Sequence, residues 1–256
     1  MSELTGIYAM WYREMKVFLR ERSRIVSSLI NPLLWLVIFG GGLGASVEVP
    51  GTTYQAFIFP GMIAMTLLFG SIFFGAYIVW DRKIDFLKEV LVSPISRVSV
   101  FFGKVLGGAT DSLLQSLILM VLGMALTFSG AIPGLVFTPF SVLMATVIIF
   151  LSTVSMVSIG LIIGSQMESP EGFQMISSFV VFPMFLLSGA LFSISNLPAW
   201  FEPFTLLNPM TYSVDALRSV LVGVSRFPVI FDMGVLSAFM LGIIAVGTYA
   251  FKKMKV

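Results

Sequence analysis

The sequence predicts an all-α membrane protein with six transmembrane helices, an N-terminal interfacial amphipathic helix, and re-entrant outer helices between the fifth and sixth spans. Three observations carry this fold class. First, 57% of the 256 residues are hydrophobic and 11% are charged, whereas a soluble domain usually carries about 25% charged residues. Second, six segments are apolar over about 20 residues, the length of helix that crosses a bilayer. Third, the positive charges gather in segments that six spans would place on one side.

The six spans are expected to form a single transmembrane domain over residues 1–256. We place them near residues 25–45, 57–80, 98–126, 137–165, 173–193 and 229–251. The fourth span carries small residues that suit close helix packing: Ser152, Ser155, Ser158, Gly160 and Gly164. The pattern leaves open whether that contact lies within the chain or across a dimer.

Residues 1–24 differ from the spans. Their apolar residues recur at spacings of three and four, and basic residues lie between them. This pattern predicts an amphipathic helix that lies in the membrane interface. A helix that packs on a partner is the alternative.

The placement of Lys and Arg predicts the orientation. Five precede the first span, five lie between the second span and the first turns of the third, and three lie in the tail. The remaining two, Arg218 and Arg226, follow the fifth span. The positive-inside rule makes the side with the thirteen charges cytoplasmic. Six spans return the chain to the side where it began, so we expect a multi-pass cell-membrane protein with both termini in the cytoplasm.

The segment 193–228 is apolar, but prolines break it into pieces of about ten residues, too short to span a bilayer. We expect two short helices that dip into the outer leaflet, with Trp200 and Tyr212 at interfacial depth. An extracellular loop packed on the bundle is the alternative.

The composition excludes several kinds of chemistry. The chain has no Cys and no His, which removes thiol nucleophiles, imidazole bases and nearly every transition-metal site. The nucleotide-binding loop GxxxxGK[ST] is absent, because the only Gly-Lys pair, Gly103-Lys104, is followed by Val105 and lacks the glycine that the motif requires five positions before Gly103. We therefore expect no catalytic residue, no metal site and no cofactor bound by this chain. A net charge of +2 gives no argument for nucleic acid.

One ionisable residue, Asp111, stands out in the third span. It lies seven residues after Lys104 and four before Gln115, so the three side chains can share a helix face. We expect Asp111 to make a structural pair with Lys104 or with a neighbouring span. The alternative is that Asp111 and Gln115 line a polar path, as in a carrier driven by protons or sodium.

The stretch DRKIDFLKEVLVSPISR at 81–97 interrupts the apolar sequence with a charged, helix-forming segment. Ile84, Leu87 and Leu91 share one helical face, and Ser93-Pro94 ends the helix because the residue before proline is pushed out of helical dihedrals. An apolar ridge with charged flanks suits docking into a partner's groove. A helix resting on anionic head groups fits equally well.

Two separated motifs resemble the permease subunits of ABC transporters of the second exporter type. The run DRKIDFLKEVLVSPISRVSVFFGKVLGG resembles their first cytoplasmic loop and the entry to their third span. The run FPMFLLSGALFSISNLPAWFEPFTLLNPMTYSVDALRSVL resembles their outer segment, with SG at 188–189, LPAW at 197–200, NPMTY at 208–212 and DALR at 215–218. The resemblance covers essentially the whole chain.

The resemblance implies a coupling helix at 81–97 that docks on a separate ATP-binding subunit. The coupling residues would be Arg82, Leu87, Glu89, Leu91, Ser93, Pro94 and Arg97, with Glu168 and Glu171 in a second, smaller cytoplasmic contact. The segment 193–222 would close the exit. This outer gate would include Trp200, Asn208, Pro209, Tyr212, Asp215 and Arg218.

The resemblance further implies that two permeases, identical or different, work with two ATP-binding subunits that hold the ATP and Mg²⁺. The chain itself would be no enzyme but a transport subunit in contact with membrane lipid. The substrate would be a hydrophobic drug or a lipid-like molecule. Export of a polysaccharide or glycolipid by a permease of the same family is the nearer alternative, and an ion-coupled carrier using Asp111 the more distant one.

Overall fold

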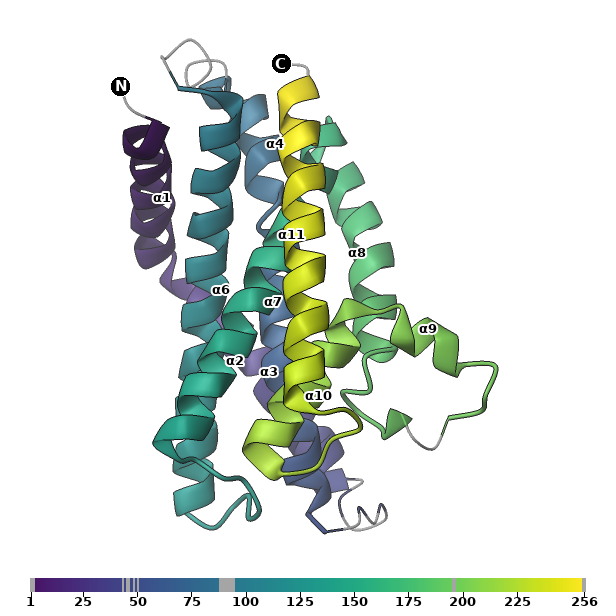
Figure 1. Ribbon diagram of the computed structural model, residues 1–256. Helices are drawn as coiled ribbons and strands as arrows, with labels where there is room; N and C mark the ends of the chain where they lie inside the picture. The colour runs from purple at the N-terminus through teal and green to yellow at the C-terminus, as the bar shows by residue number, and fades with distance from the viewer. Residues whose placement is uncertain are drawn as a thin grey trace.

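The computed structural model describes residues 3–42, 44, 47, 49, 51–87, 95–194 and 197–254. The regular structure in these residues is helical (Figure 1). The elements are α1 (Glu3–Arg20), α2 (Arg22–Trp35), the π-helical turn η1 (Leu36–Gly41), α3 (Tyr54–Phe73), α4 (Ala76–Lys83), α6 (Arg97–Phe128), α7 (Pro139–Gln166), α8 (Pro170–Leu186), α9 (Glu202–Leu206), α10 (Pro209–Val222) and α11 (Val229–Lys253).

Four helical segments of the described residues are long and apolar enough to cross a membrane. They are Tyr54–Lys83, Arg97–Phe128, Pro139–Gln166 and Val229–Lys253. A fifth is obtained if α1 and Ile25–Gly41, which meet at a bend of 68°, count as one span. The chain is therefore a multi-pass helical protein with four or five candidate spans, and the count of six stays a prediction.

The expected fifth span, 173–193, ends earlier than its composition suggests. Helix α8 has 17 residues, about 25 Å at 1.5 Å per residue, which is short for a hydrocarbon core of about 30 Å. The helix ends at Leu186, and Gly189 adopts a φ of +74°, in the left-handed region. This backbone turn breaks a run that stays apolar in sequence.

Helix α3 lies at the centre of the bundle. Nearly all its side chains are buried, and it packs against α6, α7, α8 and α10. By contrast, only 11% of the residues in the 18-residue apolar stretch of α11 are buried, whereas 72% are buried in the corresponding stretch of Tyr54–Lys83, which contains α3. The core is thus built around α3, and α11 presents most of its apolar surface outward, as a lipid-facing helix does.

Glycines allow α7 to cross the junction of α3 and α4 at backbone contact. A Cβ on Gly160 would lie 2.3 Å from the carbonyl oxygen of Ile72, and one on Gly75 would lie 2.0 Å from the carbonyl oxygen of Gly160. A Cβ on Gly164 would lie 2.4 Å from the carbonyl oxygen of Gly75. The close packing expected for the small residues of this span is therefore found within the chain.

Gly160→Ala should destabilise the fold, because the new methyl group meets backbone that cannot rotate away. Overpacking of this kind costs about 1–3 kcal/mol. Gly242→Ala on α11 is the matched control, since a Cβ there has no neighbour within 4 Å. The midpoint of thermal unfolding in mild detergent should fall in the first variant and stay unchanged in the second. Equal midpoints would show that the helices can move apart at Gly160 without a loss of stability.

Helix α1 packs against α6 through one face. Gly6, Met10, Glu14 and Phe18 are buried at a spacing of four. A Cβ on Gly103 would come within 2.5 Å of the Met10 Cβ, and one on Gly107 within 2.6 Å of the Glu14 Cβ. The two glycines of α6 therefore let α1 approach closely, as small residues do between membrane helices. The helix expected in the interface is thus held by its own chain.

The two ends of the chain lie at the same end of the bundle. Figure 1 shows α1 beginning and α11 ending at the top, with α10 toward the opposite end. This arrangement agrees with termini on one side of a membrane. The segment 193–228 contains the two short helices α9 and α10, as expected, whereas their depth in a membrane stays a prediction.

Candidate functional site

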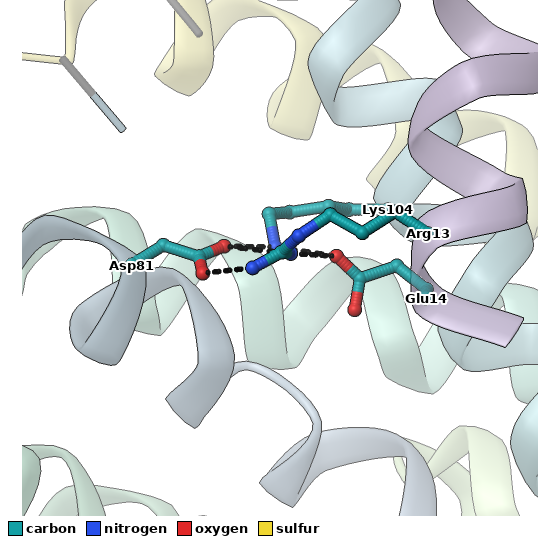
Figure 2. A network of polar contacts seen from close by, with 4 residues as sticks. All are labelled: Arg13, Glu14, Asp81 and Lys104. Atoms are coloured by element: carbon teal, nitrogen blue, oxygen red, sulfur yellow. Dashed lines mark hydrogen bonds and ion pairs between the residues drawn. The ribbon is translucent and has the colours of Figure 1, made fainter. Parts of the chain in front are cut away.

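A buried network of four charged side chains joins α1, α4 and α6. Figure 2 shows Arg13 and Glu14 of α1, Asp81 of α4 and Lys104 of α6 converging. The Lys104 Nζ lies 2.6 Å from Asp81 Oδ2 and 3.0 Å from Glu14 Oε1. The Arg13 guanidinium lies 2.8 Å from Asp81 Oδ1 and 2.8 Å from Glu14 Oε1. Each cation contacts both carboxylates.

The network is balanced in charge, and its members other than Arg13, which is 31% exposed, are shielded from solvent. The side chain of Lys104 is 0% exposed, and those of Glu14 and Asp81 are 2% and 5% exposed. Buried charges are tolerated when they are paired, whereas removing one partner leaves an uncompensated charge and costs about 3–5 kcal/mol. Arg13 also lies 4.0 Å from the centroid of the Phe86 ring. The four residues therefore act as one structural unit.

Asp111 is expected from sequence to pair with Lys104 or with a neighbouring span, and the Lys104 half of this expectation is wrong. A pairing of Asp111 with a neighbouring span stays a prediction. The ammonium group of Lys104 is bound to Asp81 and Glu14. Seven residues on a helix correspond to about 10 Å along its axis, and closer carboxylates come from the neighbouring helices. Asp111 instead accepts a hydrogen bond from Gln115 Nε2, one turn further along α6. Both of these side chains are buried.

Arg82 ties the same end of α4 to α7. Its guanidinium donates to the carbonyl oxygens of Ser165 and Met167, at 2.9 and 2.7 Å. These carbonyls belong to the end of α7, where backbone acceptors lack helical partners. Asp81 and Arg82 thus hold α4 from two sides, one toward α1 and α6 and the other toward α7.

The stretch that follows is not one continuous helix from residue 81. Helix α4 ends at Lys83, and Asp85 has a φ of +58°. Ile84 is 65% exposed, whereas Leu87, expected on the same outward ridge, is 1% exposed in the chain's own core. Glu89, Leu91, Ser93 and Pro94 lie outside the described residues. Leu87 therefore contributes to packing within this chain.

The other predicted coupling residues lie around the same end of the bundle. The Arg97 Nη1 donates to the carbonyl oxygens of Met254 and Lys252, at 2.6 and 3.3 Å, where α11 ends. Glu168 and Glu171 are exposed between α7 and the first turn of α8, next to the Met167 carbonyl that Arg82 binds. The structure thus groups Arg82 with the 166–172 loop and links Arg97 to α11.

The predicted outer-gate residues hold α10 to its neighbours. Asn208 caps α10 by accepting from the Met210 N–H, and its Nδ2 donates to the carbonyl oxygen of Met184 at 2.6 Å. Pro209 occupies the first helical position, where a missing N–H costs nothing. The Tyr212 hydroxyl donates to the carbonyl oxygen of Leu206 at 2.8 Å. Trp200 is 70% exposed, apart from these contacts.

Asp215 and Arg218 complete this anchoring. The Asp215 carboxylate accepts from the backbone N–H groups of Arg226 and Phe227, which fixes the loop after α10. Arg218, 4% exposed, donates from Nε to the carbonyl oxygen of Phe57 at 3.2 Å and from Nη2 to that of Gly189 at 2.7 Å. Arg218 is therefore no loop charge but a buried clamp between α10, α3 and the end of α8.

Two features were missed by reasoning from sequence. Glu14 stands four residues after Met10 and four before Phe18, within the apolar face of α1, a position that could have marked it as buried and paired. Asp232 begins α11 with a 0% exposed side chain, and neither carboxylate oxygen has a hydrogen-bond partner among the described residues. Its place in the sixth apolar segment could have singled it out beside Asp111.

Comparison with known proteins agrees with this architecture. The family model for the ABC-2 type transporter matches residues 5–222. The inner membrane transport permease YadH of Escherichia coli K12 is 26% identical over 245 residues, covering 91% of this chain and 90% of that protein. Nodulation protein J of Rhizobium meliloti is 28% identical over 204 residues, covering 78% and 75%. The putative transport permease ycf38 of Cyanophora paradoxa is 26% identical over 213 residues, covering 79% and 70%. The chain belongs to the ABC-2 type transporter family, as a transport permease.

Proposed function

We propose that this permease is the membrane subunit of an ATP-driven exporter, with two permease copies and two separate ATP-binding subunits that hold ATP and Mg²⁺. The coupling segment at 81–97 docks on the ATP-binding subunit, at the cytoplasmic side where both termini lie. The substrate is a hydrophobic drug or a lipid-like molecule that passes between the two permeases.

The observation that carries this proposal is the double anchoring of α4 at the start of the coupling segment. Asp81 joins α4 to α1 and α6 through Lys104, Arg13 and Glu14, and Arg82 joins it to α7. A push on the coupling segment would therefore reach four helices through buried, paired contacts. Interfaces of this kind shift between discrete arrangements more readily than they deform.

The family supports a transport subunit, and two relatives, YadH and ycf38, are named as transport permeases. Export of a polysaccharide or glycolipid would use the same coupling machinery and stays the nearer alternative. An ion-coupled carrier would depend on Asp111, whose carboxylate accepts from Gln115 on its own helix. This local pairing favours a supporting role for Asp111 over ion transport.

The first test is to purify the tagged protein in mild detergent, after expression with its genomic neighbours, and to identify what co-purifies. A stoichiometric chain with the GxxxxGK[ST] loop and ATP hydrolysis in the complex is expected. A stable, lone protein whose transport continues without an ATPase and fails in Asp111→Asn would overturn the proposal in favour of an ion gradient.

Glu89→Lys tests the docking itself. It reverses one charge in the coupling segment, and we expect less ATP-binding subunit to co-purify while the permease stays monodisperse. Glu202→Lys, in the outer segment, is the charge-matched control and should leave the recovery of that subunit unchanged. Equal recovery with both variants would show that the segment around Glu89 does not contribute to docking.

A further inference from the structure

A side pocket whose lining includes none of the four charged residues lies between α2, α3, α4 and α6. Its volume is about 300 Å³, and its lining includes Ser28, Gly70, Phe73, Tyr77, Trp80 and Gln115. A smaller cavity of about 90 Å³ shares Ser28 and Gly70 and adds Asn31 and Thr66. The lining thus combines aromatic side chains with uncharged polar ones.

The polar end of the pocket presents a hydrogen-bond acceptor. Gln115 is 1% exposed, and its Nε2 donates to the Asp111 carboxylate. Its Oε1 therefore faces the other way, and it lies 3.8 Å from the position that a Cβ on Gly70 would take. A carboxylate behind an amide polarises it and strengthens its free oxygen as an acceptor. The Ser28 hydroxyl donates to the carbonyl oxygen of Ile25, which leaves its lone pairs as a second acceptor.

The aromatic wall runs from this acceptor toward the end of α4. Phe73, Tyr77 and Trp80 follow one another at three- and four-residue spacing, and Trp80 is 48% exposed. Lys104 is level with Asp81, and Gln115 lies eleven residues further along α6, so the acceptor lies deeper in the bundle than Trp80 while lining the same pocket. A ligand in this pocket would place its polar group inward and its apolar body along the aromatic side chains, the reverse of a membrane phospholipid.

We propose that this pocket binds a compact, uncharged, ring-bearing molecule with a hydroxyl donor, which Gln115 Oε1 accepts while the rings stack against Trp80 and its neighbours. The lining supplies acceptors and aromatic faces. A buried acceptor selects strongly for a ligand with a donor, because a ligand without one leaves the acceptor unpaired. The assignment deepens the transport proposal by naming the chemistry of a substrate, and it depends on that proposal only for the claim that the molecule is exported.

The test uses the full chain in phosphatidylcholine nanodiscs and two radiolabelled probes that differ in one group. The probe 4-phenylphenol carries the donor, and 4-methoxybiphenyl has the same rings without it. Binding is measured after subtracting the binding to empty nanodiscs. The dissociation constant is expected to be about fivefold lower for 4-phenylphenol than for 4-methoxybiphenyl, the difference that one hydrogen bond makes. Gln115→Met should abolish this preference, whereas Trp80→Ala should weaken both probes several-fold and keep it.

Gln174→Met is the matched control, because Gln174 is exposed on α8 and lies outside the pocket lining. It should bind both probes as the unchanged protein does. An equal preference in the unchanged protein and in monodisperse Gln115→Met would overturn the proposal, and so would binding of neither probe above empty nanodiscs. The assay needs no ATP-binding subunit, so the two proposals fail separately.

Discussion

Replacing Lys104 with Met should lower the stability of the protein by about 3–5 kcal/mol, one of the largest effects we expect of a single substitution. The ammonium group is fully buried between Asp81 and Glu14. With the ammonium gone, Arg13 alone faces two buried carboxylates, and the site holds a net charge of −1. The midpoint of thermal unfolding in detergent should fall sharply, and much of the protein should be lost to aggregation.

A second substitution separates lost charge balance from lost packing. The double variant Lys104→Met with Glu14→Gln keeps Arg13 paired with Asp81. The Arg13 guanidinium contacts the Asp81 carboxylate at 2.8 and 3.4 Å. This double variant is neutral at the site and should unfold at a higher temperature than Lys104→Met alone. Lys252→Met, exposed at the end of α11, should behave as the unchanged protein. A double variant no more stable than the single one would show that charge balance is not what the network supplies.

The central spans could be predicted from sequence because their apolar length is a local property. Residues 57–80, 98–126, 137–165 and 229–251 correspond to the four long apolar segments of the structure. The small residues Gly160 and Gly164 also indicated close packing correctly. Composition could not predict where α8 ends, because the sequence stays apolar beyond Leu186. The chain turns there, and Gly189 adopts the left-handed conformation.

The partners of the charged residues were harder to predict, because they lie far apart in sequence. Lys104 is bound by residues 90 and 23 positions away, and Arg97 by carbonyl oxygens beyond position 250. Spacing within one helix suggested Asp111 for Lys104, but proximity across helices decides such pairs. The same holds for Leu87, which a helical ridge placed outward and tertiary packing buries.

Arg218→Met should produce the second large loss. Arg218 lies over the Phe57 ring, with its Cζ 3.8 Å from the ring centroid, and its two hydrogen bonds join α10 to α3 and to the end of α8. Hydrogen bonds from a charged group contribute about 1.5–3 kcal/mol each, and removing these leaves the Gly189 carbonyl oxygen without its donor. We expect a drop of about 3–5 kcal/mol in stability, measured as a lower unfolding midpoint, and faster proteolysis of the outer segment.

Two further variants show whether the planar guanidinium of Arg218 is required or only its positive charge. Arg218→Lys keeps the charge, but a single ammonium group cannot reproduce the planar guanidinium that reaches two carbonyl oxygens from one side chain, so it should remain clearly destabilised. Arg226→Met removes a cation whose ion pair with Glu202 is partly exposed, at 26% and 38% of the two side chains, and such pairs contribute about 0–1 kcal/mol. It should therefore change the midpoint little. If Arg218→Lys were as stable as the unchanged protein, a buried positive charge would suffice, and the clamp on Phe57 and Gly189 would not be what holds α10 in place.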